Sequence, residues 1–589
     1  MNRWTKEDHA LGADAVGALE MVMRYHQETK HHFRRYARSL GYMDWANQPD
    51  PFRRYRGSPL ISLPRLRPED APHSPPYEDL YRAGAIASAP VDIRALSRFL
   101  EYSLSISAWK QAGEVRWALR ANPSSGNLHP TEGYLLVGPV PGLLPMPGLY
   151  HYTAKEHALE LRAELSEQGF ASLLLGFPPH AFLIGFASVN WRETWKYGER
   201  AFRYCQHDVG HAVGSARIAA QTLGWRMLLL DGLDDGTLAA LLGVDRNQDF
   251  TEAEQEHPDC LAVVWPADQA AGVADEETNS LPLFFTYDAV RESVPQRWHG
   301  KANRLSRDDP VRWQILDQVE VACWKSSIER RVVELKRRRP TVETPVDSRR
   351  DVPSVDPRYS SAGQVIRQRR SALAFDGITS IPVGSFYTML ARVVPRVDRD
   401  HCQRHMPWDV LPWEPAVHLA LFVHRVDGLA PGIYLLVRDP AKTNRLRGAM
   451  RRQFAWTPPP GCPHDLPLFL LEAGDARALA VEVSCHQDIA GDSAFSLGMI
   501  AEFESSLRQY GPWFYRRLFW ETGLIGQVLY LEAEARGVRA TGIGCFFDDP
   551  VHRVLGFDDA TFQSLYHFTT GGQVEDPRLT TLPPYSLDH

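Results

Sequence analysis

The sequence has 589 residues, of which 44% are hydrophobic and 23% charged, with a formal net charge of −7. These values exclude a disordered or fibrous chain, and the acidic balance gives no reason to expect nucleic acid as a partner. The chain is too long for one hydrophobic core, so at least two domains are expected.

The seven cysteines are scattered, odd in number and contain no CxxC pair. This pattern favours reduced thiols over a disulfide framework or a zinc site, and it is typical of a cytoplasmic protein. The first residues lack the apolar stretch of a signal peptide, and no apolar run reaches the roughly 18 residues that a membrane span needs. The sequence therefore predicts a cytoplasmic protein with no bound metal and no membrane span.

Residues 1–76 are predicted to form a helical and irregular extension. Apolar residues recur at helical spacing over 15–23, and three histidines follow: His26, His31 and His32. A metal could bind there, but no carboxylate or thiol stands at ligand spacing, so a solvated helix face is favoured. Frequent prolines in the rest of the extension indicate irregular chain that wraps a neighbouring domain.

Residues 77–335 are predicted to form a first α/β domain. The pattern of apolar residues predicts a helix over 92–107, a β-hairpin over 148–161 and a strand over 181–186. The stretch 201–223 is helical in pattern and apolar nearly all round. We therefore expect this helix to lie inside a large interface.

An amphipathic helix is predicted over residues 310–339, where it ends in a basic run followed by proline. Cations suit the C-terminal end of a helix dipole, so a solvated helix end is favoured over a site for phosphate or RNA. Residues 336–358 are then interpreted as a linker, and a second α/β domain is predicted over 359–589.

The two α/β patterns are copies of one unit. With an offset of 313 residues, 208–210 fall on 521–523, and with an offset of 284 residues, 147–150 fall on 431–434. Two copies in one chain predict an intramolecular pseudo-dimer, whose interface mimics that of a two-fold homodimer.

A polar turn, Pro-Ser-Ser-Gly-Asn at residues 123–127, precedes an apolar run in the first half. It offers hydroxyls, a carboxamide and backbone N–H groups to a flat polar ligand, although an ordinary Asn/Ser/Gly turn has the same composition. The aligned residues 407–411 of the second half read Pro-Trp-Asp-Val-Leu and have lost the small polar groups.

The second half keeps a different set of groups. Arg369, Arg370 and Ser371 are predicted to open its first helix, where guanidinium groups, a hydroxyl and free N–H groups would converge on a phosphate. An exposed helix that carries arginines is the alternative. The glycine turn 542–544 permits close approach of backbone to a ring system, or is a plain tight turn. Arg578 is a further candidate phosphate ligand.

Both halves resemble the FMN-dependent nitroreductases, and the sequence is most similar to the SagB-type dehydrogenases, which oxidise azolines to azoles in modified peptides. The resemblance covers roughly residues 77–265 and 359–585. The motifs that carry it are residues 123–132, 147–152, 196–204, 369–371 and 542–550. It implies an α+β fold in which two nitroreductase-like α/β/α domains are fused as an intramolecular pseudo-dimer.

In that family each flavin lies between two subunits, which contribute the Arg-x-Ser and glycine motifs on one side and the Pro-Ser-x-x-Asn turn on the other. Each half of this chain keeps one of these sets, so the resemblance implies one composite FMN site and an empty symmetry-related site. Leu373 replaces a frequent basic residue, so either another group stabilises reduced flavin or the reduced state is less favoured. The implied cofactor-binding residues are Pro123, Ser124, Ser125, Asn127, Arg369, Arg370, Ser371, Gly542, Ile543, Gly544 and Arg578.

Azoline oxidases use a Lys-Tyr pair in catalysis, and Lys196 and Tyr197 match it. Such a pair could act as general base while hydride passes to the flavin, although a solvated helix turn would also carry these residues. His207 and His211 could suggest a metal, but their helix aligns with apolar Leu524, which favours an interface role.

We therefore expect an FMN-dependent oxidoreductase that acts on a small molecule or peptide, alone or with other peptide-modifying enzymes. Two alternatives remain from the sequence: an NAD(P)H-dependent nitro or quinone reductase with the same site, and a flavin-free scaffold or binding subunit of a peptide-modifying complex. A pseudo-dimer of this kind could be a monomer or form a higher oligomer.

Overall fold

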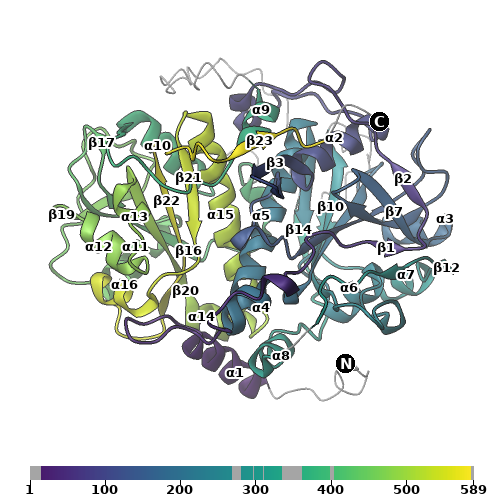
Figure 1. Cartoon of the computed structure of the whole chain (residues 1–589), viewed down its shortest axis with the longest axis horizontal. Helices are drawn as coiled ribbons and strands as arrows, with labels where there is room; N and C mark the ends of the chain where they lie inside the picture. Colours follow the sequence, from purple (N-terminus) through teal and green to yellow (C-terminus); the bar gives the residue numbers. More distant parts are fainter. Residues whose placement is uncertain are drawn as a thin grey trace.

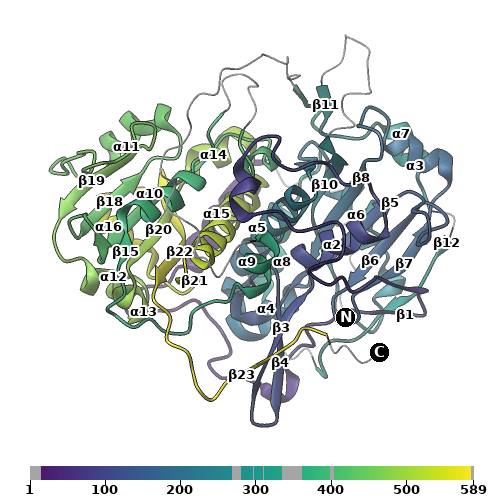
Figure 2. The same ribbon diagram turned by 90° about the horizontal axis from the view of Figure 1, so that it is seen from above.

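The computed structural model describes residues 15–267, 280–295, 297–308, 311–334, 361–397 and 404–585. Two α/β lobes lie on either side of a pair of long central helices (Figure 1; Figure 2). The predicted linker 336–358 and the basic run lie outside the described residues.

The first lobe is built on an antiparallel sheet in the order β12-β7-β6-β5-β8-β10-β9, with β2 paired to β7. Its middle strands are apolar on both faces and are buried throughout. The hairpin and the strand predicted from the sequence are confirmed. The strands are β2 Leu60–Ser62, β5 Thr131–Val137, β6 Gly148–Thr153, β7 Ala158–Glu164, β8 Phe182–Ser188, β9 Trp225–Leu229, β10 His257–Pro266 and β12 Arg297–Trp298.

The second lobe repeats this sheet in the order β19-β18-β16-β20-β22-β21. This order matches β7-β6-β5-β8-β10-β9 strand for strand, which confirms the internal repeat. The strands are β16 Val417–Val423, β18 Gly432–Leu436, β19 Leu468–Ala473, β20 Phe495–Glu502, β21 Arg539–Ile543 and β22 Phe562–Gly571.

Helices cover both faces of each sheet. The outer faces carry separate hydrophobic clusters under short helices, whereas one continuous core joins the inner faces of the two sheets across the central helices. The outer helices are α3 Glu167–Leu173, α6 Asp235–Leu242 and α7 Tyr287–Glu292 in the first lobe, and α11 Thr443–Ala449, α12 Arg477–Val483 and α16 Asp548–Leu555 in the second. The inner helices are α2 Ile93–Ser103, α4 Asn190–Tyr197, α5 Ala201–Thr222, α10 Val383–Arg392, α14 Phe503–Tyr510 and α15 Phe514–Ala535.

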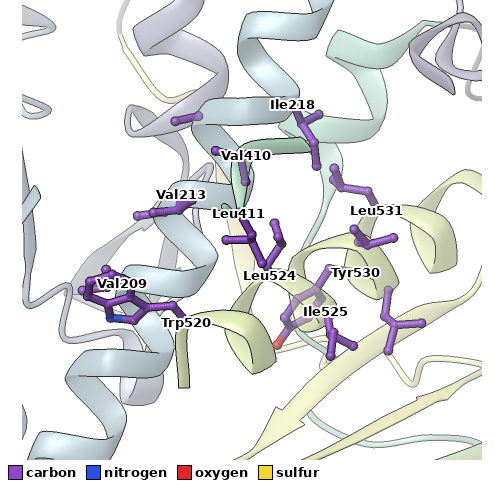
Figure 3. Close-up of a cluster of buried hydrophobic side chains, with 14 of the residues drawn as sticks. Val209, Val213, Ile218, Val410, Leu411, Trp520, Leu524, Ile525, Tyr530 and Leu531 are labelled. Carbon is purple, nitrogen blue, oxygen red and sulfur yellow. The ribbon is translucent and has the colours of Figure 1, made fainter. Parts of the chain in front are cut away.

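The central helices α5 and α15 pack directly on each other, as predicted for the apolar stretch 201–223. Apolar residues of both helices and of the 407–411 turn interlock between them (Figure 3). The helices cross at Gly210 and Gly523, which the 313-residue offset relates. A Cβ at Gly210 would overlap the carbonyl oxygen of Trp520, and one at Gly523 would overlap that of His207. The pseudo-two-fold axis therefore passes through this glycine contact.

Replacing Gly210 with alanine is expected to destabilise the protein by roughly 1–3 kcal/mol, because the new methyl group meets rigid backbone and not a flexible side chain. Urea unfolding of the full chain measures this effect. Gly17→Ala in α1 Ala15–Glu28 is the matched control, since a Cβ there meets nothing within 4 Å. Equal stability of the two variants would contradict the close contact of the central helices.

Each lobe sends a terminal segment onto the other. Strand β23 Thr580–Leu582 pairs with β3 Ile106–Ala112, which continues into β4 Val115–Arg120. At the other end, the Lys30 ammonium lies 2.8 Å from a carboxylate oxygen of Asp549 in α16. The two halves are therefore tied together by exchanged segments as well as by the central helices.

The histidine-rich stretch is not a solvated helix face, and that prediction is wrong. His26 is buried, with its two ring nitrogens 3.2 Å from Tyr515 Oη and from Gln563 Oε1. His31 is buried too, and its Nδ1 accepts the N–H of Ala37 at 3.0 Å. Contacts to the second lobe, which the local pattern does not reveal, decide this burial.

Two helix boundaries also differ from the prediction. The helix expected over 310–339 is α8 Gln314–Ala322, and it is followed by β14 Val332–Glu334, which pairs with β11 Ser280–Pro282. Beyond the helix end, the N–H of Lys325 donates to Asp235 Oδ2 at 2.8 Å, and its buried ammonium binds the carbonyl oxygen of Asp231. The helix expected over 92–107 ends at Ser103, since β-branched Ile106 already belongs to β3.

None of the helices in the described ranges combines the length and the apolar composition that a bilayer crossing requires. Within the same ranges no three histidine, cysteine or acidic side chains converge as metal ligands would. His207 and His211 lie in the helix interface, as predicted: His207 Nδ1 is 2.9 Å from Thr522 Oγ1, and its ring stacks on Tyr566 at a centroid distance of 4.1 Å.

Candidate functional site

The polar turn 123–127 forms a short 3-10 helix, η3 Ser125–Asn127, directly before β5. Gly126 and Asn127 both have left-handed backbone, with φ of 60° and 59°, which glycine and asparagine tolerate better than other residues. The polar side chains brace the turn. Ser125 donates its N–H and its hydroxyl to Asp208 Oδ1, each at 2.9 Å, and Asn127 Nδ2 donates to the carbonyl oxygen of Ala118 at 2.9 Å.

Lys196 and Tyr197, at the C-terminal end of α4, face this turn. A Cβ built on Gly126 would lie 2.7 Å from Tyr197 Oη and 3.1 Å from Lys196 Nζ. Both side chains are half-buried, so they do not form a solvated helix turn. Burial, as the largest cause, raises the pKa of Tyr197 well above its usual range, and Glu193 adds to the rise.

A continuous row of contacts leads from this pair to the second half. The ring of Tyr197 stacks on that of Tyr204 in α5, with centroids 4.2 Å apart. A Cβ at Gly544 would overlap the Tyr204 ring, and one at Gly542 would overlap Tyr566 Oη. The structure thus brings the polar turn, the Lys-Tyr pair and the glycine turn together, and the glycines are required because two tyrosines press on their backbone.

Arg369, Arg370 and Ser371 do not open a helix, and that prediction is wrong. Helix α9 Ala362–Gln368 begins at Ser361, whose capping box with Gln364 satisfies the first turn, and Arg369 is already its C-cap. Any anion here would therefore meet guanidinium groups, without the free N–H groups of a helix start.

The arginines nevertheless form a cationic cluster. Arg369 Nη2 donates to the carbonyl oxygen of Arg120 at 3.0 Å, while its buried Nε has no partner. Arg370 also donates to carbonyl oxygens, among them that of Arg367 at 2.8 Å. Within the described part of the chain, neither guanidinium pairs with a carboxylate.

Two further cations extend the cluster: Arg539 at the start of β21, and Lys110 of β3 in the first half. Burial, followed by repulsion from Arg369 and Arg539, lowers the pKa of Arg370 to about 9. Burial, as the largest cause, lowers the pKa of Lys110; Arg370 and Arg539 add to the fall, and Glu575 opposes it. Arg539 is paired with Glu534 and Glu575, at 3.6 and 3.3 Å, so the uncompensated positive charge lies on Arg369 and Arg370. Together with Arg369 Nε, which has no partner among the described residues, it fits a bound phosphate.

Three more candidate residues fall in different surroundings. Ser371 Oγ lies 2.9 Å from Tyr530 Oη, and that hydroxyl in turn accepts the N–H of Gly542 at 2.9 Å, so Ser371 lies beside the glycine turn. Arg578 is outside the cationic cluster: its side chain is 84% exposed and pairs with Asp576. Leu373 is 70% exposed.

The sequence prediction missed Arg539, Lys110, Tyr204 and Asp208. Arg539 directly precedes the glycine turn and was a visible signal, whereas Lys110 reaches the cluster only because β3 and the C-terminal strand pair across the lobes. Tyr204 and Asp208 lie on one face of the central helix α5. They were missed because the sequence pattern of this helix predicted a role in the interface and no role in a site.

The symmetry-related position is filled by side chains of this chain. Asp231, which aligns with Gly544, accepts a hydrogen bond at 2.9 Å from Nε of Arg517, the counterpart of Tyr204. In the turn opposite, Asp409 forms a two-point ion pair with Arg217 at 2.8 and 2.9 Å. The cavity beside Trp520 and Asp231 has room for roughly one water molecule.

Two carboxylates at equivalent positions of the central helices, Asp208 in α5 and Glu521 in α15, differ in their partners. Glu521 is paired with the buried guanidinium of Arg438 and accepts the N–H of Ala416 at 3.0 Å. Its counterpart Asp208 forms no ion pair within the described residues: burial raises its pKa to about 7, although bonds from Ser124 and Ser125 oppose the rise. The first turn is therefore held by a carboxyl group that titrates near neutral pH.

Asp208→Asn should reveal this titration. Between about pH 4 and pH 7 the folded protein holds a proton on Asp208 that the unfolded chain has lost, so the stability that Asp208 contributes falls as pH rises through this window. Asparagine keeps an acceptor for Ser125 and does not titrate. The melting temperature of the variant relative to wild type should therefore increase from pH 5 to pH 8. The control is the exposed Asp288→Asn, whose melting temperature relative to wild type should not change over this pH range. If the Asp208→Asn difference were equally independent of pH, the raised pKa of Asp208 would be contradicted.

Comparisons with known proteins agree with this architecture. No family model matches the chain. The chain is 24% identical over 164 residues to a protein of Methanocaldococcus jannaschii described as a nitroreductase, a match that covers 27% of this chain and 77% of that protein.

Among solved structures, a protein of Anabaena variabilis described as a nitroreductase superposes with a TM-score of 0.63 at 20% identity, covering 94% of this chain and 99% of that chain. A chain of the E. coli microcin synthetase McbBCD complex covers 45% of this chain and 97% of its own length at 18% identity, with a TM-score of 0.25 that supports no conclusion. The chain therefore has the nitroreductase fold, in two copies fused as a pseudo-dimer.

Proposed function

We propose that this protein is an FMN-dependent oxidoreductase with one composite flavin site between its two halves, and that it oxidises azoline-like heterocycles in a peptide or related small molecule. The first nitroreductase-like domain is assigned to residues 77–335 and the second to 359–589. The observation that carries the proposal is the row of contacts from Gly126 through Tyr197 and Tyr204 to Gly544. Among the described residues it joins motifs of both halves, whereas Asp231 and Arg517 are bonded to each other at the mirror position.

The residues at this place fit FMN. The cationic cluster supplies charge for a phosphate, with Arg369 and Arg370 as its centre and the Ser371 hydroxyl beside it. The glycine turn 542–544 and the polar turn 123–127 lie at the two ends of the Tyr197–Tyr204 stack, and we place the flat ring of the flavin beside them. Bound FMN would supply the hydride acceptor, which no side chain of this chain can provide.

Lys196 and Tyr197 are the groups able to move a proton from substrate. Tyr197 stays protonated at neutral pH because burial raises its pKa, so it can hold a hydrogen bond to a substrate nitrogen or oxygen. Lys196 Nζ lies on the same side of Gly126 and, in its unprotonated form, is the second candidate for the general base. The azoline assignment rests on this pair, which is the motif matched in azoline oxidases.

An anaerobic reduction experiment tests the proposal. Protein reconstituted with FMN is mixed with a synthetic thiazoline-bearing peptide or with NADPH, and the visible absorbance of the flavin is followed. We expect the peptide to bleach the flavin and to be recovered as the thiazole. Bleaching by NADPH alone would favour a nitro or quinone reductase. A chain that binds no FMN would leave only a scaffold or binding role.

A further inference from the structure

A pair of cysteines lies next to the glycine turn, outside the residues assigned to the flavin. Cys545 directly follows Gly544, and Cys485 follows helix α12. The two segments lie side by side, and each thiol is close enough to shift the pKa of the other. Both residues are partly exposed, unlike Cys205, Cys260 and Cys323, which are buried.

Two hydrogen bonds hold the segments that carry this pair side by side. Gln487 Nε2 donates to the carbonyl oxygen of Cys545 at 2.9 Å, and the N–H of Phe547 donates to the carbonyl oxygen of Val483 at 2.8 Å. Cys485 and the next residue, His486, have left-handed backbone with φ of 55° and 58°, a conformation uncommon for residues with a Cβ. The backbone is thus constrained on both sides of the thiol contact.

His31 completes the environment. Its Nδ1 accepts the N–H of Ala37, so the neutral ring carries its proton on Nε2 and can donate to the sulfur of Cys545. The hydrogen bond from Cys485, as the largest cause, and the one from His31 lower the pKa of the Cys545 thiol. Arg200 adds positive charge nearby, with Nη2 donating to the carbonyl oxygen of Gly544 at 3.3 Å. Cys545 is therefore the thiolate of the pair, and Cys485 the thiol beside it.

We propose that Cys485 and Cys545 form a redox-active dithiol that reduces hydroperoxides and closes into a reversible disulfide. The Cys545 thiolate attacks the O–O bond: an S–O bond forms, the O–O bond breaks, and the leaving oxygen takes a proton as water or an alcohol. The Cys485 sulfur then attacks Cys545 Sγ and gives up its proton, so that an S–S bond forms and the hydroxide leaves as water. Two thiols and one hydroperoxide thus give one disulfide, water and an alcohol or a second water.

The test uses the reduced full chain treated with hydrogen peroxide at one equivalent, followed by proteolysis and mass spectrometry without reductant. We expect a linked peptide pair that contains Cys485 and Cys545, two hydrogens lighter than the separate peptides, and its loss on treatment with dithiothreitol. The reaction needs no FMN, so its outcome is independent of the proposed flavin site.

Two variants sharpen this test. Cys485→Ser should leave Cys545 as a sulfenic acid that dimedone traps, with no linked peptide. Cys462→Ser removes another partly exposed thiol, whose pKa burial raises to about 11, and should leave the linkage unchanged.

Alkylation by iodoacetamide at pH 7 gives a second measure that needs no variant: Cys545 should react roughly tenfold faster than Cys462, or more. Equal alkylation rates of the two thiols, or peroxide treatment that gives no linked Cys485–Cys545 peptide, would overturn the proposal.

Discussion

Replacing Arg369 with alanine is expected to weaken FMN binding roughly a hundredfold or more, because one buried guanidinium at the centre of the cationic cluster would no longer face the phosphate. Arg369 is buried, and among the described residues its Nε has no partner while its Nη2 bonds a carbonyl oxygen. Fluorescence titration of the apoprotein with FMN measures the dissociation constant.

Arg578→Ala is the comparison variant, since the sequence offered both arginines as phosphate ligands. The exposed pairing of Arg578 with Asp576 places it outside the cluster, so its loss should change the dissociation constant by less than about twofold. If Arg578→Ala weakened FMN binding and Arg369→Ala did not, the assignment of the phosphate position would be wrong.

Replacing Lys196 with methionine is expected to slow the bleaching of bound flavin by the thiazoline peptide roughly a hundredfold to ten-thousandfold, the usual contribution of a positioned acid or base. FMN content should stay unchanged, because Lys196 faces Gly126 and Tyr197 and lies apart from the cationic cluster. Stopped-flow absorbance under anaerobic conditions gives the rate.

Lys155→Met, at an exposed turn, is the control for loss of one surface charge and should keep the wild-type rate. A Lys196→Met protein that binds FMN and is reduced as fast as this control would remove the lysine from the proposed proton transfer. The Tyr197 hydroxyl would then be the remaining candidate.

The sequence alone predicted the repeat, the fold and the convergence of three motifs. Residues 208–210 and 521–523 align because the glycine crossing of the central helices tolerates no side chain in either copy. The polar turn and the glycine turn could be paired across the chain because each has a degraded counterpart in the other half.

The local sequence pattern could not predict the features of the structure that depend on tertiary contacts. Arg369 and Arg370 looked like a helix start, yet the capping box of Ser361 starts that helix about two turns earlier, and Arg369 is its C-cap. His26 and His31 looked solvated because the partners that bury them lie more than 450 residues away, in the second lobe. Lys110 joins the cationic cluster through a strand pairing that no spacing in the sequence reveals.

The stoichiometry of flavin in the reconstituted full chain tests the central claim most directly. Protein is saturated with FMN and freed of unbound flavin, and flavin absorbance is compared with protein concentration from amino-acid analysis. One FMN per chain is the predicted result, because one position joins Gly126 to Gly544 while the other is occupied by the ion pairs of Asp231 and Asp409. Two flavins per chain would contradict the filled second position, and none would contradict the composite site itself.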